Sequence, residues 1–167
     1  MLKTSLLLFF ACTTLICAQE NSTHRTAYYL EIAVDEEHQY AMDVPESPYL
    51  VAPNTLQLFC NEKIWVECKV QDNVIQSMKV VEQNTNPSKT IEIEFRQEAE
   101  DRASIQTILK VKNPFDKELH YDAMMFPPKH QDWVETSILP VLPKLEGYEL
   151  WPHAILTLVL ENWKLEE

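Results

Sequence analysis

Histidine and carboxylate side chains recur at a short spacing around residue 120 of this sequence. His120 and Asp122 are two residues apart, so on a β-strand they would project from the same face, and His130 follows after a short loop. Imidazole and carboxylate groups bind copper or zinc, which makes these three residues a candidate metal site. No further cluster completes a set of four ligands, and this spacing also arises on any solvated strand face, which is the interpretation we favour.

Neighbouring carboxylates, such as Asp35 with Glu36 and Glu37, could serve as a general acid and base. Catalytic carboxylates need a buried partner with a shifted pKa, whereas consecutive acids in a polar stretch usually form a solvated turn. The chain has a single glycine, Gly147, and therefore lacks both a glycine-rich phosphate loop and the glycines of a serine nucleophile elbow. We assign no catalytic residue and no cofactor, and a non-enzymatic protein is favoured over a hydrolase.

Cys60 and Cys68 allow two interpretations. Outside the cytoplasm such a pair usually forms a disulfide. If residues 61–63 form a tight hairpin turn, however, the two cysteines would lie roughly 13 Å apart along the sheet, and a disulfide needs Cα atoms within about 7 Å. A disulfide and two separate buried thiols both stay open, and in either case we expect the cysteines to contribute to stability rather than to chemistry.

Four aromatic residues are candidates for a binding surface. The same hairpin would place Phe59 beside Trp65 on one face, and Trp133 and Trp151 lie in a Pro-rich segment, residues 126–152. Exposed aromatic rings stack on sugars and insert into protein interfaces, so these residues would suit a protein or carbohydrate partner. The alternative is that a loop or a second sheet covers them.

The charge of the chain excludes one class of partner. It has 26 acidic and 14 basic residues, a formal net charge of −12 at pH 7. Such a surface repels phosphate backbones, so we expect no nucleic-acid partner.

The elements that would position these side chains are strands, because apolar residues recur with a period of two. The clearest case is Ile91, Ile93 and Phe95, which are separated by charged residues. We also expect a hairpin over residues 103–125 and strands at 28–34, 55–60, 64–70, 74–81 and 154–164. The pattern predicts an all-β fold, an antiparallel immunoglobulin-like β-sandwich of about 7–9 strands, with one long Pro-rich crossing loop over residues 126–152.

The N-terminal segment has the order of residues of a secretory signal. Lys3 precedes an apolar run, and the small residue Ala18 provides a cleavage site. We expect residues 1–18 to be removed and residues 19–167 to form a single domain without a transmembrane helix, exported to the periplasm or secreted. The alternative is lipid anchoring through Cys12.

The C-terminal third carries a resemblance to known proteins. Its residues are Lys-Asn-Pro at 112–114, Thr-Ser-Ile-Leu-Pro-Val at 136–141, Glu-Leu-Trp-Pro-His at 149–153 and the closing apolar strand. This part resembles uncharacterised families of bacterial exported proteins, in which a Lys-Asn-Pro hairpin precedes a Pro-rich crossing loop. The resemblance implies export and a β-sandwich, and it implies no activity and no site.

These observations favour an exported, non-enzymatic domain with a binding role or a structural role in the cell envelope. The alternative is an exported hydrolase or a copper- or zinc-binding protein.

Overall fold

The structure is a computed structural model of the 167-residue chain, and it describes residues 23–167 except 101, 103 and 131. The predicted signal segment, the predicted start at residue 19 and the alternative anchor at Cys12 lie outside the described residues. Among the residues that are described there is no helix, and hence none long and apolar enough to cross a membrane.

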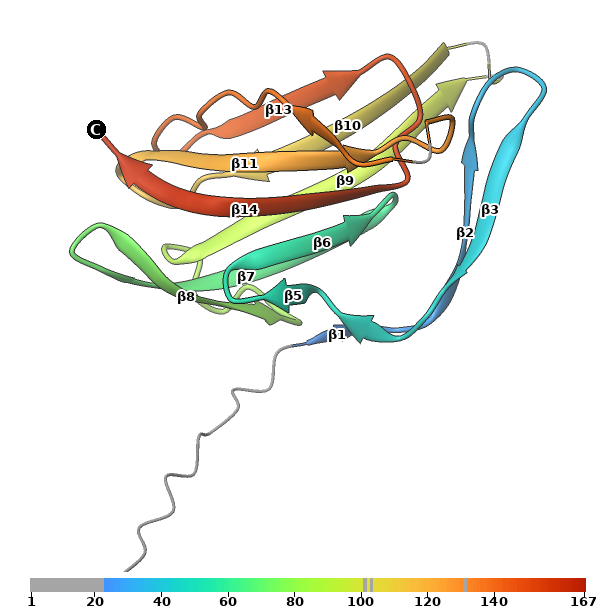
Figure 1. The fold of residues 1–167 in the computed structure, drawn as a ribbon. Helices are drawn as coiled ribbons and strands as arrows, with labels where there is room; N and C mark the ends of the chain where they lie inside the picture. The colour runs from blue at the N-terminus through green and yellow to red at the C-terminus, as the bar shows by residue number, and fades with distance from the viewer. Residues whose placement is uncertain (1–22, 101, 103, 131) are drawn as a thin grey trace, which may run out of the picture.

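Two five-stranded antiparallel sheets pack together, so the fold is an all-β sandwich (Figure 1). The β9 sheet has the order β13 (Glu146–Trp151), β10 (Ser104–Lys112), β9 (Thr90–Glu100), β7 (Glu62–Gln71), β8 (Val74–Val81). The β14 sheet has the order β12 (Val134–Thr136), β11 (Glu118–Phe126), β14 (Thr157–Glu166), β6 (Thr55–Phe59), β5 (Leu50–Ala52). Two small sheets pair β2 (Tyr28–Ala33) with β3 (Gln39–Val44), and β1 (His24–Arg25) with β4 (Ser47–Pro48).

The core lies between the two large sheets and is built by the predicted alternation. Ile91, Ile93 and Phe95 of β9 are fully buried, and they face Leu56 and Leu58 of β6, which are equally inaccessible. Each such side chain contributes about 1.5–3 kcal/mol of transfer free energy relative to exposure. This repeated burial holds the two sheets together.

Two connections that we expected to be tight hairpins instead carry the chain from one sheet to the other. β6 pairs with β14 and β7 pairs with β9, so residues 60–61 cross between the sheets. In the same way β10 pairs with β9 and β11 pairs with β14, so the hairpin expected over residues 103–125 is wrong. The sequence pattern is the same in both cases, because each strand needs one buried face whether or not its neighbour lies in the same sheet.

A buried amide fixes the second crossing. The Nδ2 group of Asn113 donates hydrogen bonds to the carbonyl oxygens of Lys117 (2.7 Å) and Val141 (2.8 Å), and its Oδ1 accepts one from the backbone N–H of Phe115 (2.9 Å). Asn113 is fully buried, so these bonds satisfy polar groups that would otherwise have no partner. The side chain thereby sets the path of the chain from β10 to β11.

The Pro-rich segment is not one long loop. It includes β12 and the six-residue strand β13, which pairs with β10. Pro140, Pro143 and Pro152 lie outside these strands, so they flank the pairing rather than interrupt it.

The β2–β3 hairpin forms an arm that stands at one end of the sandwich (Figure 1). The side chain of Gln97 on β9 joins the arm to the β9 sheet. Its Nε2 donates to the carbonyl oxygen of Ala33, and its Oε1 accepts from the N–H of the same residue, both at 2.9 Å. The side-chain amide thus bonds to the end of β2 as a neighbouring strand would.

Candidate functional site

The three residues of the candidate metal site do not come together. His120 lies beside Glu118 and Glu166 at 3.2 and 3.9 Å, and Asp122 accepts a hydrogen bond from Asn162. His130 lies beyond the end of β11, where it lines a different region, described below. In the part of the chain that the structure describes, no group of three His, Cys, Asp or Glu side chains could hold a metal ion.

The expected pair of Phe59 and Trp65 is also not formed, because the two residues belong to different sheets. Phe59 lies under the guanidinium of Arg25, whose Cζ is 5.1 Å from the ring centre. Trp65 donates from Nε1 to Glu92 at 3.3 Å. Their chain neighbours Leu58 and Val66 point into the core, so the two rings face the opposite outer sides of the sandwich.

The two tryptophans of the Pro-rich segment differ in exposure. Trp151 is buried and donates from Nε1 to the hydroxyl of Thr136 at 3.0 Å, so it belongs to the core. Trp133 keeps 39 % of its surface exposed and packs edge-on against Phe126. Of the two, only Trp133 retains a surface for a partner.

Cys60 and Cys68 are both free and buried, so the disulfide is not formed. Cys60 follows β6 of one sheet and Cys68 is on β7 of the other. Burial raises the pKa of each thiol to about 12, which keeps both in the unreactive protonated form at neutral pH.

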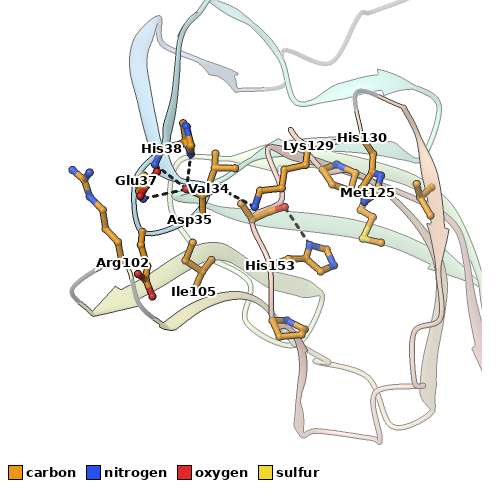
Figure 2. A pocket seen from close by; sticks show the side chains of 15 residues that line it. Val34, Asp35, Glu37, His38, Arg102, Ile105, Met125, Lys129, His130 and His153 are labelled. Atoms are coloured by element: carbon orange, nitrogen blue, oxygen red, sulfur yellow. Dashed lines mark hydrogen bonds and ion pairs between the residues drawn. The ribbon is translucent and has the colours of Figure 1, made fainter.

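A cavity of about 850 Å³ lies between the tip of the β2–β3 arm and the end of the sandwich (Figure 2). Four stretches of chain that are distant in sequence contribute to its walls. They are residues 34–38 of the arm tip, Arg102 and Ile105 at the start of β10, Met125, Pro127, Lys129, His130 and Val134 around the β11–β12 connection, and residues 152–154 before β14.

The arm side of the cavity is organised around Asp35. Lys129 contacts its Oδ2 at 3.0 Å, and His38 Nδ1 lies 2.7 Å from its Oδ1, so both side chains converge on this carboxylate (Figure 2). The N–H groups of Glu37 and His38 also donate to Oδ1. The ammonium of Lys129, followed by the contact with His38, holds the pKa of Asp35 well below its usual range. The Lys129–Asp35 contact links the arm tip to the β11–β12 connection.

The opposite side of the cavity combines imidazoles with apolar side chains. His153 Nδ1 lies 3.2 Å from the carbonyl oxygen of Ala154, and its own carbonyl accepts a hydrogen bond from the buried hydroxyl of Thr107 at 2.7 Å. These bonds fix the chain before β14. Figure 2 shows His130 and His153 on the same side of the cavity as Met125. This side therefore offers hydrogen-bonding groups next to apolar surface.

The sequence contained the residues of this cavity but no signal that joins them. The pattern of acidic residues at 35–37 indicates a solvated turn, and no other candidate residue lies near His38 or His153 in the sequence. Only the pairing of β2 with β3 and the end-on position of the arm bring them near His130. A search for short motifs could not have found an arrangement of four separate stretches.

No family model matches the chain, and no curated protein and no solved structure matches it either.

Proposed function

We propose that this protein is an exported binding domain that holds a small organic molecule in the cavity between the β2–β3 arm and the end of the sandwich. The observation that carries the proposal is the cavity itself. Its volume of about 850 Å³ is within the usual range of ligand sites. Such sites combine apolar walls with a few polar groups that orient the ligand.

The lining supports a ligand with an apolar body and a polar group. Ile105, Met125 and Val134 offer aliphatic surface, and His130 and His153 offer ring nitrogens to a hydrogen-bonding group. The two hydrogen bonds of Gln97 hold the base of the arm and the exposed Lys129–Asp35 pair adds a contact at its tip, which supports a cavity that is formed before a ligand enters. A site that is already formed loses less conformational entropy on binding.

Export and the finer fold class are part of the same proposal. The two crossings between sheets, at residues 60–61 and after β10, support an immunoglobulin-like arrangement of the sandwich. The signal-like order of residues 1–18 supports removal of this segment during export to the periplasm or secretion. The intact mass of the protein from its own host would show whether the chain starts at Gln19.

The binding function is tested with three probes that share an eight-carbon chain: octanoate, octylamine and octanol. NMR signals of the Met125 methyl group and of the His130 and His153 rings report on occupation of the cavity. We expect saturable shifts with at least one probe, and we expect Ile105→Trp, which fills the cavity, to weaken that binding roughly tenfold or more.

The matched control is Val74→Trp, which adds the same ring at a residue of β8 that is 54 % exposed and lies outside the cavity. It should leave the affinity unchanged. If no probe produces saturable shifts at these three residues, or if both tryptophan variants act alike, the proposed function is wrong.

A further inference from the structure

Exposed apolar side chains gather along one edge of the sandwich, on β13 and the segment that precedes it. We call this surface the leucine edge and define it as Leu139, Leu142, Leu145, Tyr148 and Leu150. Each of these residues keeps at least half of its surface accessible, from 50 % for Tyr148 to 75 % for Leu139. Four of them border a shared depression of about 210 Å³. Exposed apolar residues concentrated in this way mark interaction surfaces more often than scattered ones do.

The backbone of the leucine edge is also open to a partner. β13 has a neighbouring strand on one side only, β10, and the described hydrogen bonds join its main chain to no other segment. Half of the N–H and C=O groups of an edge strand point away from its sheet and can pair with another extended chain.

At the opposite edge of the same sheet, other segments of the chain bond to the main chain of β8. The N–H of Thr23 donates to the carbonyl of Val80 on β8, and the side chain of Asn54 donates to the carbonyl of Ile75. Other parts of the chain therefore bond to two main-chain carbonyl groups of β8. The fold leaves the six residues of β13 without such bonds among the described residues, and these have neither a lysine nor a proline, the usual residues that block edge pairing.

The charge of β13 favours a partner with basic residues over a second copy of this chain. The strand carries Glu146 and Glu149 and no basic residue. Lys110 pairs with Glu146 at 3.2 Å, whereas Glu149 accepts a hydrogen bond from the N–H of Leu139 and has no basic partner among the described residues. The β13 strand of a second copy would bring two more carboxylates and no basic residue of its own to the junction, and each copy has a net charge of −12.

We propose that the leucine edge is a docking site for an extended segment of another protein, one that alternates apolar and basic residues and adds to the β9 sheet as a strand beside β13. The main chain of the segment would pair with β13, its apolar side chains would pack on Tyr148 and Leu150, and its basic side chains, which project from the other face, would meet Glu149. Strand addition at a free edge works in this way, with backbone pairing for affinity and alternate side chains for selectivity. This docking site is separate from the cavity and does not depend on the proposed ligand.

The probe for this site is a pair of end-blocked synthetic peptides of equal length, one alternating lysine with valine and the other alternating glutamate with valine. Binding to the full chain is measured by NMR titration, and amide hydrogen exchange maps the contact. We expect the lysine peptide to bind, to slow exchange along β13, and to bind at least roughly tenfold more tightly than the glutamate peptide.

Two lysine substitutions separate this edge from the general surface. Leu150→Lys should weaken binding of the lysine peptide roughly tenfold or more. Val74→Lys places the same charge on the β8 edge at a residue of nearly equal exposure, 54 % against 53 %, and should not change the affinity. The Ile105→Trp variant, which fills the cavity, should bind the lysine peptide normally.

Three results would overturn the proposal. They are no binding of the lysine peptide, equal binding of both peptides, and slowed exchange at strands other than β13. Concentration-dependent dimerisation of the free protein with protection of β13 would assign the edge to a second copy and overturn the choice of partner.

Discussion

Arg25 and Glu62 form an ion pair with both side chains almost fully withdrawn from solvent, at 2 % and 5 % exposure. Arg25 Nε contacts Oε1 of Glu62 at 2.8 Å and its Nη2 contacts Oε2 at 3.3 Å. The remaining donors of the guanidinium reach the Ser47 hydroxyl and the carbonyl oxygens of Pro48 and Gln57. The pair therefore ties the N-terminal strand β1 to β4, β6 and β7.

Arg25→Met is expected to lower the free energy of unfolding by about 3–5 kcal/mol, because it leaves the Glu62 carboxylate buried without its counter-ion. Urea denaturation measures the change. The double variant with Glu62→Leu should recover part of the loss, since it removes the unpaired charge. Lys63→Met, in the more exposed Lys63–Glu92 pair, is the control and should cost less than about 1 kcal/mol. Equal losses for Arg25→Met and Lys63→Met would contradict the account.

Gln97→Ala should loosen the β2–β3 arm, because it removes both hydrogen bonds to the backbone of Ala33. The expected cost is about 1–3 kcal/mol, with faster hydrogen exchange of the Ala33 amide. Gln97→Glu retains an acceptor for that amide and loses the donor to the carbonyl, so its effect should be intermediate. Unchanged exchange in both variants would show that the arm is held by other contacts.

Asn113→Asp should destabilise the fold although it preserves the shape of the side chain. The carboxylate cannot donate to the carbonyl oxygens of Lys117 and Val141, so both lose a partner in a buried site. We expect a loss of at least about 2 kcal/mol, measured by thermal and urea unfolding. Asn162→Asp, at an exposed hydrogen bond to Asp122, serves as the control and should change stability much less.

The thiols of Cys60 and Cys68 should react with a thiol reagent only after denaturation. Both are buried and protonated at neutral pH, and the reagent needs an accessible thiolate. Counting reactive thiols in native and in urea-denatured protein checks this. Rapid reaction of either thiol in the native protein would contradict it.

The same thiols should make stability fall at alkaline pH. In the unfolded chain a thiol ionises near pH 8.5, whereas burial raises the pKa of each cysteine to about 12 in the folded protein. The unfolded state then binds fewer protons, so the free energy of unfolding decreases as pH rises from about 8.5 toward 12. Each thiol adds up to about 1.4 kcal/mol per pH unit to this slope. The slope of Cys60→Ala/Cys68→Ala, compared with the native chain, isolates this contribution.

The strands were predictable from the sequence, whereas their partners were not. The alternation of apolar and polar residues identified the buried faces of β9 and β6, because burial of one face of a strand requires an apolar residue at every second position. The residues around Asn61 contain no local feature that distinguishes a crossing between sheets from a hairpin turn. The choice between a hairpin and a crossing depends on pairing of β6 with β14, about 100 residues along the chain. The expected contact of Phe59 with Trp65 followed from the wrong choice.

The cavity could not be predicted for the same reason. Its residues, among them Asp35 and His153, become neighbours only through the arm and three loops. Sequence reasoning did locate the aromatic residues, and it left open whether they were exposed. Trp151 proved buried in the core, where its indole N–H bonds to Thr136, a contact that depends on where the chain passes before β13.

The turns of this protein place residues other than glycine in the left-handed region of the backbone. Among the described residues seven have a positive φ, and five of these are asparagine or aspartate: Asn54, Asn61, Asp72 and Asn73 in turns, and Asn162 at the register shift within β14. The only glycine, Gly147, is not among them. Glycine would relieve strain at each position but would also widen the range of conformations open to the denatured chain, an entropic effect of about 0.4–1 kcal/mol per site. Some of the stability of this domain thus comes from the restricted conformations of its denatured chain. This contribution does not appear in any contact of the folded protein.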